Sequence, residues 1–373
     1  MVKTKKKRGG LWRKHPFPYY LNKKIRGLLM RTINLFLGEV RKEKVSLPGE
    51  EIKKILLVRI NFRIGNAILA IPAISIFQKN FPHARIDFIG APVSGVLYQH
   101  LPVNQHYGIT RKFPGILWSY FSLLYKIRSM KYDLAVDVSC SQSMTSSLVV
   151  GFSGARIRAG SQGKWDYWLT MSVPRPAETN KYKVLPVFFR TMGMETQQIL
   201  PQLILSSEEK AKGKGKVMAF MELNHVPIVG VFVGGRKSKG KKWPVENFLE
   251  LITTLRAQGM RVIVFFGPDE KELMVLFRQS LGKDVPLVFE SSLRIFASMV
   301  AHCNLFIACD SGPMHLSCAL GVRTIALFLK GNFHHWGPPP EIAHIIYRTE
   351  GIRVEDIVEV AVAVAEVGNV TLS

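Results

Sequence analysis

At 373 residues the chain is long enough for two domains, since one hydrophobic core commonly serves ~150 residues. Hydrophobic residues make up 47% and charged residues 21%, a balance typical of a globular protein. No apolar stretch approaches the ~18 residues of a membrane-spanning helix. No apolar segment with a small-residue cleavage site follows the basic start, so we expect neither a spanning helix nor a secretory signal.

The basic N-terminal region dominates the charge. Residues 1–44 carry 14 lysines and arginines against two glutamates, which is half of the net charge of +24. Residues 1–10 are expected to form a disordered basic arm, and residues 23–38 an amphipathic helix with an apolar face of Leu28, Leu29, Ile33, Phe36 and Leu37. Such a segment suits an anionic membrane surface, or it packs on the body of the protein. Nucleic acid is disfavoured as a partner, because no nucleic-acid-binding motif accompanies the charge.

From residue 52 onward, short β-branched runs alternate with helical patterns, as in parallel α/β layers. Strands are expected at 54–60, 85–90 and 133–139, with a helix at 67–80. The alternation restarts at residue 227, with strands at 227–235, 261–267, 286–289, 304–310 and 323–329 and helices at 245–259, 270–282 and 292–303. We therefore predict two doubly wound, Rossmann-like domains over 52–205 and 227–345, after an N-terminal segment of 1–51 and before a C-terminal helix within 346–373.

The cysteines give no sign of a metal site. Cys140, Cys303, Cys309 and Cys318 lack the spacing of metal ligands, and three of them lie in apolar segments. Buried free thiols are typical of a reducing compartment, so we expect a cytoplasmic protein without a bound metal.

The stretch "DSGPMHL" (310–316) follows an expected strand and opens a helix. Asp310 or Ser311 could simply cap that helix, with Pro313 in its first turn. Alternatively, Gly312 allows a ligand to approach the backbone, and the free amides of the helix start attract a phosphate, with His315 one turn further on. Ligands bind outside the carboxyl ends of parallel strands. The other segments at the carboxyl ends of this sheet therefore bear on the choice between a helix cap and a ligand site.

Two further segments fall at the same edge of the second sheet. The segment "GGRKSKGKKWP" (234–244) is either a solvated run of charge or a polyanion site, where a lysine meets a diphosphate. The loop "FGPDEKE" (266–272) could hold ribose hydroxyls through its carboxylates, or it is only a helix start with acids in the first turn.

These motifs, taken in order, resemble glycosyltransferase family 9, the bacterial heptosyltransferases that build the lipopolysaccharide inner core. The resemblance covers roughly residues 52–340 and depends most on "DSGPMHL", with "KKWP" before it and "WGP" after it. It implies a GT-B fold, with the nucleotide sugar on the C-terminal domain and the acceptor on the N-terminal one. It further implies a peripheral protein at the cytoplasmic face of the inner membrane.

The reaction implied by the resemblance is inverting, metal-independent sugar transfer without a cofactor. The donor would be ADP-heptose, and the acceptor lipid A-core or a similar phosphorylated lipid-linked molecule. Carried over position by position, Lys241 would contact the diphosphate. The other implied substrate-binding positions are Gly65, Gly234, Gly235, Glu270 for the ribose, Asp310, Ser311, Gly312, Pro313, Met314 and His315.

The chain departs from the family at Asn66, where relatives usually have an aspartate that acts as general base. An amide cannot accept the proton of the acceptor hydroxyl. Asn66 would then orient the acceptor, and Asp137 or His83 would be the substitute base. Alternatively, Asp137 is a carboxylate at the end of a strand that caps the following helix. The alternative is a non-catalytic or repurposed sugar-nucleotide-binding protein of the same fold.

Overall fold

The computed structural model describes Leu28, Thr32, Leu47 and the ranges 52–109, 115–141, 143–220, 226–235 and 240–370, without the side chains of 115–121 and 365–370. The basic arm and amphipathic helix predicted within residues 1–51 therefore lie outside the described residues, apart from those three positions. No helix in the described part is long and apolar enough to cross a membrane.

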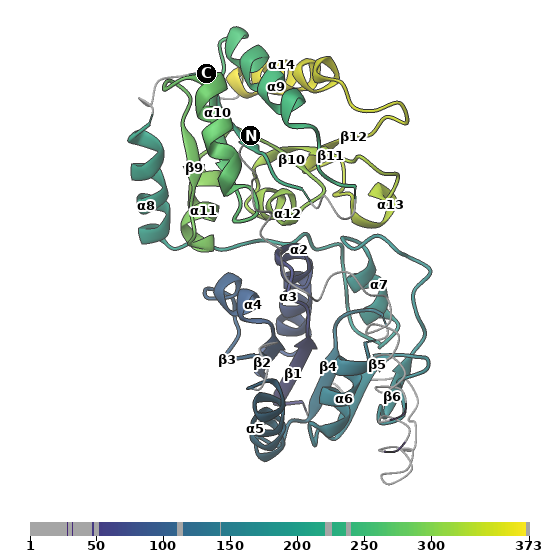
Figure 1. Ribbon diagram of the computed structural model, residues 1–373. Helices are drawn as coiled ribbons and strands as arrows, with labels where there is room; N and C mark the ends of the chain where they lie inside the picture. Colours follow the sequence, from purple (N-terminus) through teal and green to yellow (C-terminus); the bar gives the residue numbers. More distant parts are fainter. Residues whose placement is uncertain are drawn as a thin grey trace, which may run out of the picture.

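The first half forms a sheet of six parallel strands, ordered β3-β2-β1-β4-β5-β6 (Figure 1). The strands are β1 (Lys54–Arg59), β2 (Arg85–Gly90), β3 (Gln105–Gly108), β4 (Leu134–Asp137), β5 (Ile157–Ser161) and β6 (Met171–Val173). The helices of this half are α2 (Ile64–Ile68), α3 (Ile71–Asn80), α4 (Pro92–Leu97), α5 (Gly115–Ser129), α6 (Met144–Phe152) and α7 (Val184–Arg190).

The second half repeats this architecture with the order β12-β11-β10-β7-β8-β9, again all parallel. Its strands are β7 (Ile228–Phe232), β8 (Arg261–Phe266), β9 (Leu287–Phe289), β10 (Leu305–Cys309), β11 (Arg323–Leu327) and β12 (Ala343–Ile346). Its helices are α9 (Val245–Ala257), a 3₁₀ turn (Lys271–Leu273), α10 (Met274–Leu281), α11 (Leu293–Val300), α12 (Gly312–Ala319), α13 (Phe333–Trp336) and α14 (Val354–Val370). The prediction of two doubly wound α/β sheets is confirmed.

Helix α8 (Ser207–Met218) lies between the two sheets in the chain and starts with a capping box, in which Ser206 and Glu209 satisfy each other's backbone amides. The predicted helix at 67–80 is divided into α2 and α3. Pro72 lies in the first turn of α3, where its missing N–H and its ring interrupt the helical hydrogen bonds.

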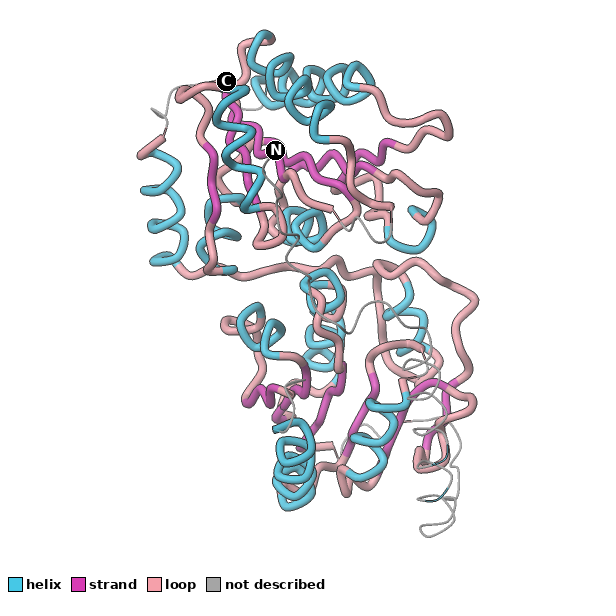
Figure 2. Tube along the Cα trace, viewed as in Figure 1, coloured by secondary structure: helices cyan, strands magenta, loops and turns pink. Residues whose placement is uncertain are grey.

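The two halves share buried apolar surface. One continuous cluster of buried residues includes side chains of α3 and α7 from the first half and of α11 and α12 from the second. The other face of the first sheet packs against α5 and α6, and the other face of the second against α9 and α14. At the centre, α2, which follows β1, packs against α12, which follows β10, at the domain junction (Figure 2). The carboxyl ends of β1 and β10 therefore face the same junction.

Candidate functional site

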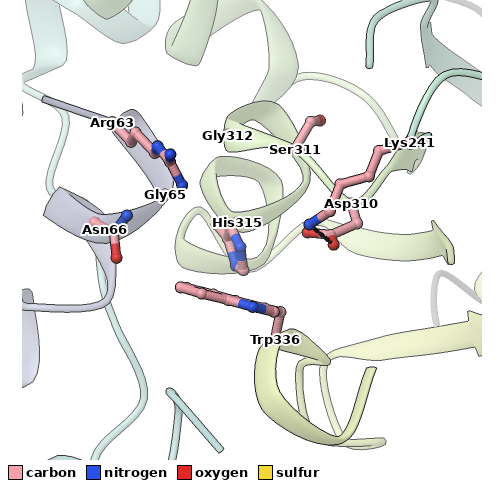
Figure 3. Close-up of a pocket in the computed structure, with 9 residues that line it drawn as sticks. All are labelled: Arg63, Gly65, Asn66, Lys241, Asp310, Ser311, Gly312, His315 and Trp336. Atoms are coloured by element: carbon pink, nitrogen blue, oxygen red, sulfur yellow. Dashed lines mark hydrogen bonds and ion pairs between the residues drawn. The ribbon is translucent and has the colours of Figure 1, made fainter. Parts of the chain in front are cut away.

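A pocket of about 200 Å³ opens where the two domains meet. Its N-terminal side comes from the segment after β1 and its C-terminal side from the segments after β7, β10 and β11 (Figure 3). The residues that line it are Arg63, Gly65, Asn66, Lys241, Asp310, Ser311, Gly312, His315 and Trp336. Seven of the residues predicted for substrate binding or catalysis are therefore brought together around one space.

Asp310 follows the last residue of β10 and is only 7% exposed. Its Oδ2 accepts a short hydrogen bond from Nζ of Lys241 and a second, of 2.8 Å, from Nδ2 of Asn332. The carboxylate is thus hydrogen-bonded to a cation and to an amide, and it does not cap α12. In turn, it holds the ammonium group of Lys241 at the edge of the pocket.

The N-terminus of α12 also lacks the cap that Ser311 could supply. Ser311 has an extended backbone and makes no side-chain cap bond, and its Oγ is buried without a hydrogen-bond partner in the described part of the chain. Unpaired donors and acceptors in a buried position cost free energy unless a ligand or water satisfies them. Of the two interpretations of "DSGPMHL", the capped helix is wrong for these two side chains, and the ligand-facing helix start agrees with the structure.

Two glycines permit the close contact between α2 and α12. A Cβ at Gly312 would lie 2.9 Å from Cβ of Ile64, and a Cβ at Gly65 would lie 2.5 Å from Cδ2 of His315. Both distances are shorter than real Cβ contacts, so a larger residue at either position would force the facing side chain or helix to shift. The imidazole of His315 consequently lies directly against the backbone at Gly65.

His315 itself is held by the other domain. Its Nδ1 lies 2.7 Å from Oη of Tyr182, a buried residue that precedes α7, and its ring centroid lies 6.5 Å from that of Trp336. Burial is the main cause that lowers the pKa of His315 to about 4; Lys241 lowers it further and Asp310 opposes the shift. The imidazole is neutral at pH 7.

Asn66 faces the pocket from α2, and both ends of its amide are in use. Oδ1 accepts a hydrogen bond of 3.2 Å from Nη2 of Arg59, and Nδ2 donates one of 3.2 Å to Oδ1 of Asn61. Arg59 is held in turn by a 2.9 Å bond from Nη1 to the carbonyl of Val138. The amide orientation is therefore set by the protein.

A family model of glycosyltransferase family 9 (heptosyltransferase) matches residues 120–354, which is more than half of the chain. The chain belongs to this family. It is a glycosyltransferase, and lipopolysaccharide heptosyltransferase 3 of Escherichia coli is 24% identical over 295 residues, which cover 74% of this chain and 83% of the relative.

Solved structures share the fold. The family 9 glycosyltransferase from Veillonella parvula DSM 2008 superposes with a TM-score of 0.74 at 18% identity, covering 84% of this chain and 97% of that one. E. coli ADP-heptose lps heptosyltransferase II superposes with a TM-score of 0.70 at 21% identity, covering 85% and 99%. The GT-B architecture of this glycosyltransferase is thereby shown.

The structure does not place Asp137 in the pocket of this glycosyltransferase. Asp137 ends β4, is 2% exposed and accepts a 3.0 Å bond from the backbone of Ser139. It shares a sheet face with Ala135, which packs against α5 and α6, on the side away from α3 and α7. Burial raises its pKa to about 7, against the effects of the Ser139 hydrogen bonds and of Arg59. Its carboxyl group has no access to a ligand in the pocket.

His83 is also far from the pocket in the fold. It is exposed in the turn between α3 and β2, which is the amino end of the strand, whereas the pocket lies at the carboxyl ends. The interpretation of His83 as a substitute base is therefore wrong.

Gly234, Gly235 and Glu270 form a neighbouring cluster at the ends of β7 and β8, outside the pocket lining. Glu270 is 6% exposed, and the backbone of Gly235 and Gly267 hydrogen-bonds its carboxylate. Burial is the main cause that raises its pKa, and Lys242 opposes the shift. A Cβ at Gly235 would lie 2.1 Å from the carbonyl oxygen of Lys241, so this glycine supports the segment that carries the lysine.

Pro313 and Met314 do not line the pocket, contrary to their assignment as substrate-binding residues. Pro313 occupies the first turn of α12, and Met314 is fully buried in the shared apolar cluster. Both residues belong to the start of the helix and lie outside the pocket lining.

Sequence reasoning missed Arg63 and Trp336, which the pocket contains. Arg63 directly precedes α2, in the segment that follows β1. Its place after the carboxyl end of a strand was a signal in the sequence that it could line a site. Trp336 belongs to the "WGP" stretch that carried the family resemblance, but nothing in the pattern assigned it a contact. No group of three or more His, Cys, Asp or Glu residues able to hold a metal ion occurs in the described ranges.

Proposed function

We propose that this glycosyltransferase transfers heptose from ADP-heptose to a sugar of the lipopolysaccharide core, with inversion at the anomeric carbon. Support for the donor and the acceptor comes from the relatives, which are lipopolysaccharide heptosyltransferases, and from a solved structure whose name is ADP-heptose lps heptosyltransferase II. The acceptor is a phosphorylated, lipid-linked molecule in this proposal.

The proposal depends on one observation: a cation and a helix N-terminus line one side of the pocket, and residues of the other domain line the opposite side (Figure 3). Lys241, Ser311 and the N-terminus of α12 lie on the C-terminal side. Gly65 and Asn66 lie on the N-terminal side. A lysine and a helix N-terminus stabilise the negative charge that develops on a departing diphosphate, so the first side suits the donor. An acceptor hydroxyl would enter from the second side, opposite the leaving group, which is the geometry of inversion.

Attachment to the cytoplasmic face of the inner membrane is part of the proposal, since the acceptor is lipid-linked. The basic segment 1–44 supplies the attraction to anionic lipid, where each lysine or arginine near the surface contributes about 1 kcal/mol.

Two measurements test this function. ADP, UDP, GDP and ADP-heptose are each added to the protein in a thermal-shift assay, where a ligand at ~100 times its Kd adds about 2.7 kcal/mol of stability. ADP-heptose is then incubated with truncated lipopolysaccharide cores, with release of ADP and the anomeric configuration of the product as readouts. Stabilisation by ADP and its sugar, followed by transfer with inversion, is expected. Failure of every nucleotide to stabilise the protein would show that the donor assignment is wrong.

A further inference from the structure

The proposed transfer needs a group that takes the proton of the acceptor hydroxyl. Asn66 cannot do so, and its amide is already bonded to Arg59 and Asn61. Asp137 is buried on the α5 and α6 side of the sheet and does not line the pocket. The base has to be found among the residues that do.

Only two side chains of the pocket lining can accept a proton near neutral pH, Asp310 and His315. Asp310 receives hydrogen bonds from Lys241 and Asn332, and it lies with Lys241 on the side of the pocket away from Asn66 (Figure 3). His315 lies nearer the acceptor side, because its Cδ2 and Nε2 edge faces Gly65, with Nε2 3.3 Å from a Cβ built there. Its described hydrogen bonding is confined to Nδ1.

The hydrogen bond between Oη of Tyr182 and Nδ1 of His315 links the tautomer of the ring to the direction in which the tyrosine hydroxyl donates. This hydroxyl contacts both Nδ1 of His315 and the side chain of Cys318. When the hydroxyl donates to the sulfur of Cys318, it accepts from Nδ1, so that Nδ1 carries the hydrogen and Nε2 keeps its lone pair. This tautomer directs a proton acceptor toward the acceptor side of the pocket.

We propose that His315 is the general base of this glycosyltransferase and that Tyr182 is its positioning residue. The inference rests on the proposed function. As the acceptor oxygen bonds to the anomeric carbon, the bond from that carbon to the diphosphate breaks, and its electron pair leaves with ADP. The hydroxyl proton passes to Nε2 of His315, and the imidazolium returns it to water when the products leave.

The surroundings of His315 suit this role. Burial, with the nearby ammonium group of Lys241, keeps the imidazole neutral at pH 7, while Asp310 favours the imidazolium once it forms. Arg63 lines the same pocket from the acceptor side, and Tyr182 packs against the ring from the N-terminal domain. With its pKa lowered to about 4, the free imidazole is unprotonated at pH 7, so one ring nitrogen is available to accept a proton.

The first test compares His315→Gln with wild type. Glutamine can still hydrogen-bond Tyr182, but it takes no proton. We expect kcat for ADP release to fall ~10²- to 10⁴-fold, while thermal stabilisation by ADP is unchanged. His344→Gln is the matched control, because His344 is exposed on β12 outside the pocket, and it should retain wild-type kcat.

A second test separates a base from a structural histidine. His315→Ala leaves room for a ring in the pocket, so added imidazole should restore turnover. Across a series of substituted imidazoles of similar size, the rescued rate should rise with the pKa of the added base. Tyr182→Phe should lower kcat by a smaller factor than His315→Gln, without changing KM for ADP-heptose.

Three results would overturn the inference while leaving the donor site intact. They are a His315→Gln kcat within threefold of wild type, rescue that does not depend on the pKa of the imidazole, and loss of turnover in Asp137→Asn with ADP binding retained. If the wild-type protein binds no nucleotide, it is the proposed function that fails. Thermal shift of the wild type and kcat of the variants therefore report on the two proposals separately.

Discussion

Nη2 of Arg59 donates a hydrogen bond of 3.2 Å to Oδ1 of Asn66, across a half-buried contact at the end of β1. The guanidinium is fixed by a second bond to the carbonyl of Val138, so it cannot readily turn away. The position at which the family resemblance implies a carboxylate base therefore lies beside a fixed cation in this chain.

We expect Asn66→Asp to raise kcat less than tenfold. The new carboxylate would pair with Arg59, which lowers its pKa and makes it a poor proton acceptor. The measurement is the initial rate of ADP release at saturating ADP-heptose. A hundredfold rise with unchanged nucleotide affinity would show that the natural protein lacks a base and is a weakened transferase.

Lys241→Ala should weaken ADP binding roughly 10- to 100-fold, because a hydrogen bond to a charged group contributes about 1.5–3 kcal/mol. The variant also leaves the buried carboxylate of Asp310 without its cation. Titration calorimetry with ADP measures the change. Lys212→Ala, at an exposed pair with Glu208, is the control and should bind ADP as wild type does. If both variants bind ADP with the same affinity, Lys241 does not contact the diphosphate.

Gly65→Ala should lower both stability and turnover. Its Cβ would lie 2.5 Å from Cδ2 of His315, and overpacking of this kind typically costs about 1–3 kcal/mol. Urea unfolding and kcat are measured on the same preparation. Gly215→Ala in α8, with nothing within 4 Å of the added Cβ, should instead be neutral or stabilising by up to about 1 kcal/mol. A Gly65→Ala protein with wild-type stability would mean that α2 and α12 do not pack as described.

Asp137 should make stability depend on pH between about 4 and 7. Its pKa is raised to about 7 in the fold, so the native state binds a proton that the unfolded chain releases near its ordinary pKa of ~3.9. Stability from this group is therefore lost as pH rises through that window, by an amount on the order of a few kcal/mol. Between pH 4 and 6.5 the lowered pKa of His315 acts in the opposite direction.

Asp137→Asn isolates the first contribution, because it leaves His315 in place. The urea midpoint of the variant relative to wild type should increase from pH 5 to pH 8. A difference that stays constant over this range would contradict a raised pKa for the buried carboxyl group.

Deletion of residues 1–44 removes half of the net charge and the apolar face predicted within 23–38. The shortened protein should no longer co-sediment with anionic phospholipid vesicles, while ADP still stabilises it. Wild-type co-sedimentation should weaken as salt is raised. If the shortened protein co-sediments with the vesicles as the full chain does, residues 1–44 do not attach the protein to the membrane.

The sequence by itself determined the two parallel sheets and the carboxyl-end edge at which the pocket lies. Both follow from local signals, namely buried β-branched runs and the glycines and polar residues that end them, which act within a few residues of the chain. The helix start at Asp310–His315 is also marked by a local signal, the stretch "DSGPMH". Its motif, with Lys241 upstream, was enough to locate the candidate donor site.

The tertiary structure decided which of those side chains line the pocket. Asp310 could have capped its own helix, but it pairs with Lys241, 69 positions away in the chain. Tyr182 reaches His315 across 133 positions. Asp137 lies at the carboxyl end of β4, the edge of the sheet at which the pocket lies. Because side chains alternate between the two faces of a strand, its carboxyl group points to the face that α6 covers. Contacts between distant segments depend on how whole layers pack, and no short stretch of sequence carries that information.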